Sequence, residues 1–251
     1  NAFLVGNGRN ILTVDNANIY NNKISGNGLL WLGDNSALII KGGSFHDNTV
    51  SNNGTIAYAN SGGCTITING GEFYNNKAAN GGVVYMPGND TLTINGGNFY
   101  SNTATGSGGA IVQGNGNVNV NMTINGGDFH DNNAVNGGAI YMGTNTGLAT
   151  LTMIGGKIYN NTANNGGAVY IPNKGKVTLS AAEDAAVGGI IRDNTASQLA
   201  SNLYLGGAGS SLTVGEKTLL HGGTIAGDVL FAQGGTVDLA DTQDLHTDGI
   251  E

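Results

Sequence analysis

Aromatic side chains recur at regular intervals in this chain and are its strongest candidates for binding chemistry. One row holds Tyr20, Tyr74, Tyr100 and Tyr159, with His46 and His130 at equivalent positions, and a second row holds Trp31, Tyr85, Tyr141, Tyr170 and Tyr204. If they point outward, such rows could stack on sugar rings or form the centre of a protein interface. The candidate ligand-binding residues are therefore Trp31, Tyr85, Tyr141, Tyr170, Tyr204, Tyr74, Tyr100 and Tyr159.

A structural role for the same rings is the competing interpretation. Neighbouring rings could stack on one another, and the segments 87–90, 114–119 and 143–148 could cover them as loops. The sequence leaves both interpretations open.

Carboxylates offer the second kind of chemistry, because most glycoside hydrolases use a pair of them. One outward column is predicted to read Asn18, Ser44, Glu72, Asn98, Asp128, Lys157. Its two carboxylates would lie two coils apart, about 10 Å at a rise of ~4.8 Å per coil, which exceeds the usual separation in these enzymes. The better candidate is an irregular repeat with Glu183, Asp184, Arg192 and Asp193. A solvated ion pair in a tolerated insertion explains the same residues.

We predict no catalytic residue, no metal site and no cofactor. His46 and His130 would lie three coils apart, so they could not share a metal ion. The single cysteine, Cys64, excludes an internal disulfide framework.

Threonines form a third candidate surface. Outward positions of one predicted strand column hold Thr65, Thr67, Thr91, Thr93, Thr150 and Thr152, with Thr123 beside Asn121. This array resembles the threonine face of ice-binding β-helices, although Thr is also a favourable residue on any exposed strand.

An internal repeat must position all of these side chains. Seven copies of a string that closes on Asn begin at Ile19, Phe45, Phe73, Phe99, Phe129, Ile158 and Ile191, 26 to 33 residues apart. Strings with the pattern Asn-Gly-Gly-Ala-Ile-Tyr follow at 80–85, 108–112, 136–141 and 165–170, and Thr-rich strings precede at 65–69, 91–95, 121–125 and 150–154. Each repeat thus contains three β-favouring runs separated by Gly and Asn.

The repeat predicts a parallel rather than an antiparallel arrangement. Asn-Gly pairs could mark antiparallel hairpins, in which consecutive strands would have matching faces. The sequence similarity is instead between strands one whole repeat apart. A parallel solenoid requires this similarity because equivalent strands of successive coils stack on one another. We predict an all-β, right-handed parallel β-helix with three short strands per coil.

Strand parity assigns the core and the corners of this β-helix. The predicted inward columns are Phe45, Phe73, Phe99 and Phe129; Leu30, Ile56, Val84, Ile111, Ile140 and Val169; and Ile40, Ile68, Ile94, Ile124 and Met153. We expect the closing Asn of each copy to turn the corner and to bond its equivalent one coil away.

Composition limits the domain organisation and the partners. Residues 1–200 form the predicted repeat region of about seven matched coils, and residues 201–251 form irregular last coils and a cap of the same domain, with Asp238, Asp241, Asp244 and Asp248. Asn1 at the start suggests a processed or excised piece. The net charge of −8 argues against nucleic acid and anionic membrane as partners. The longest apolar runs are too short to insert into a membrane.

The combination of Gly-Gly-Ala-Ile/Val and Phe-x-x-Asn strings over residues 18 to 195 resembles the chlamydial polymorphic membrane proteins and related bacterial surface adhesins. The resemblance implies a pectate-lyase-like solenoid, an extracellular passenger domain of the autotransporter type, and attachment to a host-surface protein or glycan. We therefore expect a non-enzymatic bacterial cell-surface or secreted adhesin-like protein. The alternative is a polysaccharide-active hydrolase or lyase, with ice binding as a distant third possibility.

Overall fold

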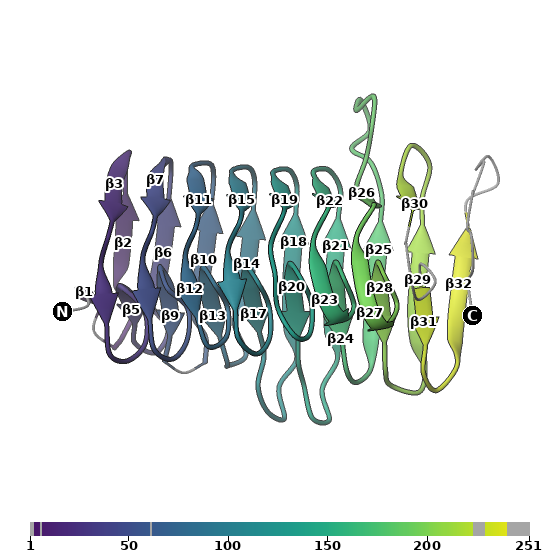
Figure 1. The fold of residues 1–251 in the computed structure, drawn as a ribbon, viewed down its shortest axis with the longest axis horizontal. Coiled ribbons are helices and arrows are strands. Elements are labelled where there is room, and N and C mark those ends of the chain that lie inside the picture. The colour runs from purple at the N-terminus through teal and green to yellow at the C-terminus, as the bar shows by residue number, and fades with distance from the viewer. Residues whose placement is uncertain (1–2, 6, 61, 223–228, 240–251) are drawn as a thin grey trace.

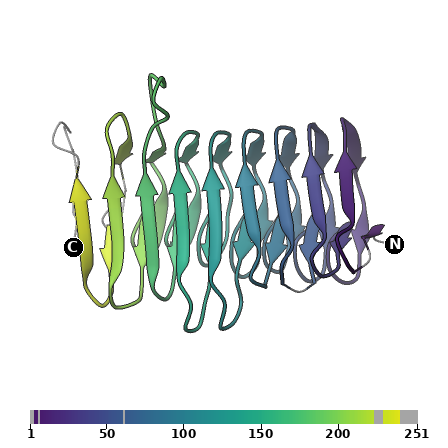
Figure 2. The same ribbon diagram turned by 180° about the vertical axis from the view of Figure 1, so that it is seen from behind.

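The chain forms a parallel β-solenoid (Figure 1). The computed structural model describes residues 3–5, 7–60, 62–222 and 229–239, and these contain strands and turns but no helix. The coils contribute one short strand each to three long sheets, and six further strands of two to five residues lie at a fourth side. Coils stack side by side along the rod, with β1 and β32 at its opposite ends (Figures 1 and 2).

The strands fall into four groups, which we call sheets A to D. Sheet A contains β1 (Phe3–Val5), β5 (Leu30–Leu32), β9 (Ala57–Ala59), β13 (Val84–Met86), β17 (Ile111–Gln113), β20 (Ile140–Met142), β24 (Val169–Ile171), β28 (Leu203–Leu205) and β31 (Val229–Phe231). Sheet B contains β2 (Ile11–Val14), β6 (Ala37–Ile40), β10 (Thr65–Ile68), β14 (Thr91–Ile94), β18 (Val120–Ile124), β21 (Ala149–Met153), β25 (Gly175–Leu179), β29 (Ser210–Val214) and β32 (Gly235–Leu239). Sheet C contains β3 (Ala17–Tyr20), β7 (Gly43–His46), β11 (Glu72–Tyr74), β15 (Asn98–Tyr100), β19 (Asp128–His130), β22 (Lys157–Tyr159), β26 (Ile190–Arg192) and β30 (Leu219–His221). Sheet D contains β4 (Lys23–Ile24), β8 (Thr49–Val50), β12 (Lys77–Ala78) and β16 (Thr103–Ala104), followed by the separate pair β23 (Thr162–Asn165) and β27 (Thr195–Leu199).

Every strand pair is parallel and joins equivalent residues of neighbouring repeats, which confirms the predicted parallel β-helix. Phe73, for example, pairs with Phe45 on one side and with Phe99 on the other. The antiparallel hairpin alternative is therefore wrong. The right-handed sense of the coil and the domain boundary near residue 200 stay predictions, although β28 to β32 continue the same sheets. Of the acidic cluster, Asp241, Asp244 and Asp248 lie outside the described residues, and so does the side chain of Asp238.

Aromatic rings fill the interior beneath sheet C. Phe45, Phe73, Phe99 and Phe129 are fully buried, and successive ring centroids are 4.9, 4.6 and 4.5 Å apart with nearly parallel planes. The predicted first- and third-strand columns are buried as well. Ring-on-ring contact adds to the free energy gained by burial, so this stack ties successive coils together.

A buried asparagine ladder runs along the corner after sheet C. Asn48, Asn76, Asn102, Asn132, Asn161 and Asn194 are at most 1% exposed, and each side-chain oxygen accepts from the asparagine one coil before it. The predicted bonding between coils is thus confirmed, but the corner itself is made by the preceding residue. Asn21, Asp47, Asn75, Ser101, Asp131, Asn160 and Asp193 have φ of 53 to 55°. Asn, Asp and other small polar residues tolerate this left-handed conformation better than most.

Asp90 is a buried carboxyl group at the start of β14. Its two oxygens accept the backbone N–H groups of Cys64 and Gly88 at 2.8 and 3.0 Å, and the residue is 1% exposed. Burial raises the pKa of Asp90 from 3.8 to about 6.

Asp90 should therefore make folding more favourable at acidic pH. The folded state holds the proton more tightly than the unfolded chain, so this contribution is absent well above pH 6, grows as the pH falls, and is complete below the unfolded pKa. It amounts to about 3 kcal/mol. We expect the unfolding free energy of the wild type, minus that of Asp90→Asn, to rise by most of this amount, about 2.4 kcal/mol, between pH 7.5 and pH 4 in urea titrations. A difference that stays constant with pH would contradict the assignment.

Candidate functional site

Six outward side chains of sheet C form one continuous stack, which we call the aromatic ladder. It consists of Tyr20, His46, Tyr74, Tyr100, His130 and Tyr159. Successive ring centroids lie 4.6 to 5.2 Å apart, and the planes differ by 14° or less. The Arg192 guanidinium lies 5.3 Å from the Tyr159 ring centroid and closes the stack. The predicted outward row is therefore present, and its successive rings stack on one another.

Stacking decides which part of each ring a ligand can reach. The rings from His46 to His130 have a neighbour on both faces, and these side chains are half-buried. A sugar ring cannot lie flat on a face that another ring already covers. Within the ladder, only Tyr20, which is 50% exposed, has a face that neither another ring nor the Arg192 guanidinium covers among the described residues. The inner rungs therefore offer ring edges, with phenol hydroxyls and imidazole nitrogens, for hydrogen bonding.

Acidic corner residues add charge to the ladder edge. His46 Nδ1 lies 2.7 Å from Asp47 Oδ2, and His130 Nδ1 lies 2.7 Å from Asp131 Oδ2. The hydrogen bond with His46 holds the pKa of Asp47 below its usual value. His130 Nε2 also contacts Asn98 Oδ1 at 3.0 Å. The edge thus presents tyrosine hydroxyls together with two imidazole–carboxylate pairs.

The second row, on sheet A, is interrupted and partly covered. Trp31, Tyr58 and Tyr85 form one run, Tyr141, Tyr170 and Tyr204 form another, and Val112 stands between them. Tyr85 is only 8% exposed, and its hydroxyl accepts a hydrogen bond of 3.2 Å from Asn115 in the segment 114–119. Burial raises the pKa of Tyr141, and it raises that of Tyr170 to about 12. Loop cover is therefore confirmed for Tyr85, and the aromatic ladder is the more accessible row.

Tyr58 belongs to this second row and was missed by the sequence reasoning. The predicted inward column placed Ile56 beside Leu30 and Val84, whereas Ala57 occupies that position. Ile56 lies one position before Ala57, in the turn, and it is aligned with Val83 of the next coil. The side chains of Ile56 and Val83 are both buried. Aligning Gly54 with Gly81, both in a left-handed conformation, finds the correct register and Tyr58 with it.

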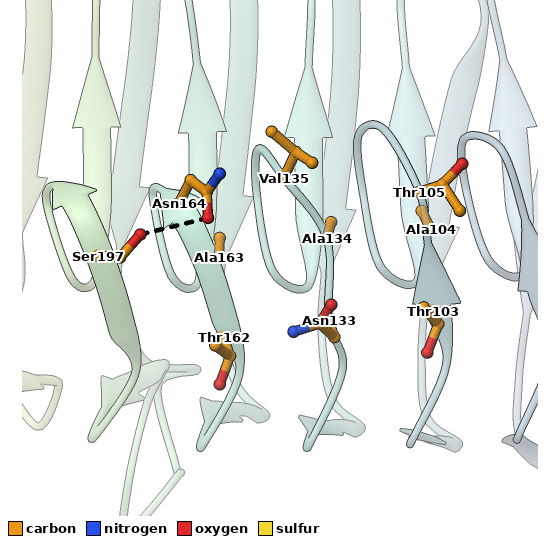
Figure 3. Close-up of a pocket in the computed structure, with 10 residues that line it drawn as sticks. All are labelled: Thr103, Ala104, Thr105, Asn133, Ala134, Val135, Thr162, Ala163, Asn164 and Ser197. Carbon is orange, nitrogen blue, oxygen red and sulfur yellow. Dashed lines mark hydrogen bonds between the residues drawn. The ribbon is translucent and has the colours of Figure 1, made fainter.

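A shallow furrow of about 450 Å³ lies over sheet D, one corner beyond the aromatic ladder (Figure 3). Its lining residues are Thr103, Ala104, Thr105, Asn133, Ala134, Val135, Thr162, Ala163, Asn164 and Ser197. Alanines alternate with exposed hydroxyl and amide side chains from successive coils (Figure 3). The lining carries no charge, so the furrow offers hydrogen bonds but no acid, base or nucleophile of the hydrolytic type.

The structure keeps the candidate carboxylates apart. Glu72, Asn98, Asp128 and Lys157 are successive rungs of one column, as predicted. Asn98 donates to Glu72 at 3.3 Å, and Lys157 lies 4.0 Å from Asp128. Glu72 therefore faces a neutral amide and Asp128 faces a cation, and neither faces a second carboxylate.

The irregular repeat is likewise divided. Arg192 pairs with the adjacent Asp193 and stacks on Tyr159, whereas Glu183 lines a separate hollow of about 240 Å³ with Glu216 and Lys217. Asp184 follows Glu183 in the loop between β25 and β26, and this loop projects from the rod (Figure 1). His46 and His130 are three rungs apart in the ladder, as predicted. Among the described residues, no group of three or more His, Cys, Asp or Glu side chains could hold a metal ion.

Threonines line the outer face of sheet B, seen in front in Figure 2. One in-register column consists of Thr13, Ile39, Thr67, Thr93, Thr123, Thr152, Thr178 and Thr213. The neighbouring column contains Thr65, Thr91, Asn121, Thr150 and Lys176. The predicted outward array is therefore present, but a lysine and an asparagine interrupt its second column.

Fold and surface together define a parallel β-solenoid repeat protein with an outward aromatic ladder. No family model, no curated protein and no solved structure matches the chain. The described part of the chain holds no helix with the length and hydropathy to cross a bilayer.

Proposed function

We propose that this chain is a non-enzymatic, adhesin-like recognition rod of a bacterial cell surface or secreted protein. Its ligand is a host-surface protein or a glycan, and the aromatic ladder is the contact surface. The observation that carries the proposal is the unbroken stack of six half-exposed rings from Tyr20 to Tyr159.

Display at a fixed pitch is the proposed mechanism. Each coil adds one ring edge to the row, so a ligand that spans several coils makes several weak contacts at once. Because inner ring faces are covered, these contacts are hydrogen bonds to hydroxyl and imidazole groups and edge-on apolar contacts. Stacking holds the rings in place before binding, which lowers the entropy lost when the complex forms.

Charge limits the choice of ligand. The chain carries a net charge of −8, and Glu72, Asp47 and Asp131 flank the ladder. An anionic ligand would be repelled, whereas a neutral glycan or a basic protein surface would not.

Removing two central rungs should weaken ligand binding. We expect Tyr74→Ala/Tyr100→Ala to bind about tenfold or more weakly to the ligand found by screening the wild-type chain on glycan arrays and host-cell surface proteins. The matched control is Thr67→Ala/Thr93→Ala, which changes the same two coils on sheet B and should bind normally. Circular dichroism would verify that both variants fold.

Three results would overturn this proposal. The first is equal loss of binding in the ladder variant and in the control. The second is turnover of any polysaccharide in reducing-sugar and unsaturated-product assays, which would favour the hydrolase or lyase. Thermal hysteresis of the wild-type chain would favour ice binding instead.

A further inference from the structure

The two histidines of the aromatic ladder share their exposure and their stacking but not their hydrogen bonding. Each imidazole is stacked between two tyrosine rings, and each side chain is 18% exposed. Each Nδ1 atom lies 2.7 Å from a carboxylate oxygen of the next residue, which is Asp47 for His46 and Asp131 for His130. The two rings therefore differ chiefly in what their Nε2 atoms contact.

The Nε2 atom of His130 is occupied. It lies 3.0 Å from Asn98 Oδ1. The amide nitrogen of Asn98 donates to Glu72 at 3.3 Å, so the amide oxygen is the atom that faces the imidazole. With a carboxylate oxygen at Nδ1 and an amide oxygen at Nε2, both ring nitrogens donate, and no lone pair is left for a ligand. His130 thus links three successive coils through Asn98 and Glu72.

The Nε2 atom of His46 is open. No hydrogen-bond partner among the described residues reaches this atom, and it is not buried. Asn18 holds the place beside His46 that Asn98 holds beside His130. Within the described part of the chain, however, the Asn18 amide makes no hydrogen bond to the ring.

Asp47 determines which nitrogen of His46 carries the proton in the neutral ring. The hydrogen bond with His46 holds the pKa of Asp47 below its usual value, and the other carboxylate oxygen accepts from the Asn75 amide at 3.2 Å. Because an ionised carboxylate only accepts, Nδ1 of His46 is the donor. Nε2 then carries the lone pair of the neutral imidazole and can accept a hydrogen bond from a ligand.

We propose that His46 is the rung through which the aromatic ladder selects its ligand, with Nε2 accepting a hydrogen bond from a hydroxyl group of a neutral glycan, while His130 ties neighbouring coils together. This inference rests on the proposed function of the ladder and narrows its ligand. Glycan hydroxyls both donate and accept, so they match an imidazole acceptor flanked by the phenol hydroxyls of Tyr20 and Tyr74. An ammonium group only donates, so it leaves the phenol O–H groups without an acceptor.

Carbethoxylation by diethyl pyrocarbonate compares the two imidazoles without any ligand. The lone pair of an imidazole nitrogen attacks a carbonyl carbon of the reagent, forms an N–C bond and displaces ethyl carbonate, so a ring whose two nitrogens both donate does not react. We expect His46 to react about tenfold or more faster than His130 in the folded wild-type chain at neutral pH, as measured by peptide mass spectrometry. Because the two side chains are equally exposed, access alone predicts equal rates.

The asparagines beside the two rings provide matched variants. Asn98→Ala removes the oxygen at His130 Nε2 and should raise the reaction rate of His130 toward that of His46. Asn18→Ala should leave the rate of His46 unchanged. Equal rates for the two histidines in the wild type, or an unchanged rate of His130 in Asn98→Ala, would overturn the distinction between them.

Binding to an array of neutral glycans tests the ligand. His46→Phe keeps a stacked ring but has no nitrogen, so we expect it to bind the glycans that the wild type selects about fivefold or more weakly. The control Thr67→Ala, on the outer face of sheet B, should bind as the wild type does. Equal binding by His46→Phe and the wild type would overturn the role of His46.

Two further outcomes separate this inference from the proposed function. Wild-type binding to an oligolysine peptide but to no neutral glycan would overturn the glycan as ligand and leave a recognition rod for a basic protein. A wild-type chain that binds no glycan, no oligolysine and no host-cell surface protein would overturn the proposed function itself, whatever the reactivity of the two histidines.

Discussion

Phe99→Ala should lower the free energy of unfolding by about 3–5 kcal/mol, the range for truncation of a buried phenylalanine. Phe99 is fully buried, and its ring lies between those of Phe73 and Phe129 at centroid distances of 4.6 and 4.5 Å. The substitution removes both ring contacts and leaves a cavity between two coils. Because the flanking coils are held by the same stack, they cannot collapse into it freely. Urea unfolding followed by circular dichroism measures the loss.

The neighbouring residue supplies the control for this truncation. Tyr100 carries a ring of similar size at 5.0 Å from Tyr74 and 5.2 Å from His130, but it lies on the outer surface and is half-exposed. We expect Tyr100→Ala to lower the unfolding free energy by only about 1–2 kcal/mol. Equal losses for the two variants would mean that inside and outside have been assigned wrongly.

Asn102→Ala should be almost as damaging, by about 3–5 kcal/mol, although it removes no apolar surface. Asn102 Oδ1 accepts the N–H and the amide of Asn76, at 3.1 and 3.0 Å, and its own amide donates to Phe73 O at 2.8 Å. Alanine leaves these groups buried without partners. A buried donor that loses its acceptor loses its whole solvation energy, because water cannot replace the lost bond.

An exposed asparagine ladder on the same coils provides the comparison. Asn95 donates to Asn69 and accepts from Asn125, both at 2.7 Å, but these side chains lie at the surface. Water can replace both bonds, so Asn95→Ala should change the unfolding free energy by less than about 1 kcal/mol. If both variants lost the same stability, burial would not be what makes the inner ladder important.

The sequence is sufficient to predict the strand order and the core columns because each coil must bury the same positions against its neighbours. The prediction failed locally at Ile56, where two successive residues face inward at a turn. Strand parity assumes that side chains alternate, and that assumption does not hold where Gly54 turns the chain. Parity therefore assigns the large Ile56 to the inward strand position that Ala57 occupies. As a result, it leaves Tyr58 out of the aromatic row.

The sequence also could not show how the outward rings are used. The spacing placed His46 and Tyr74 in one column, but only the rotamers show that their planes differ by 1° and that their faces cover each other. Likewise, the cover over Tyr85 depends on a hydrogen bond from Asn115, 30 residues away. Contacts of this kind depend on loop conformations that no local pattern encodes.

Aromatic nuclear Overhauser effects test the in-register parallel stack most directly. With selectively labelled phenylalanine, we expect cross-peaks between the rings of Phe73 and Phe99 and between those of Phe99 and Phe129, and none between Phe73 and Phe129, which are two coils apart. Missing neighbour cross-peaks, together with Hα–Hα contacts between strands consecutive in the chain, would show antiparallel pairing and contradict the whole assignment of surfaces.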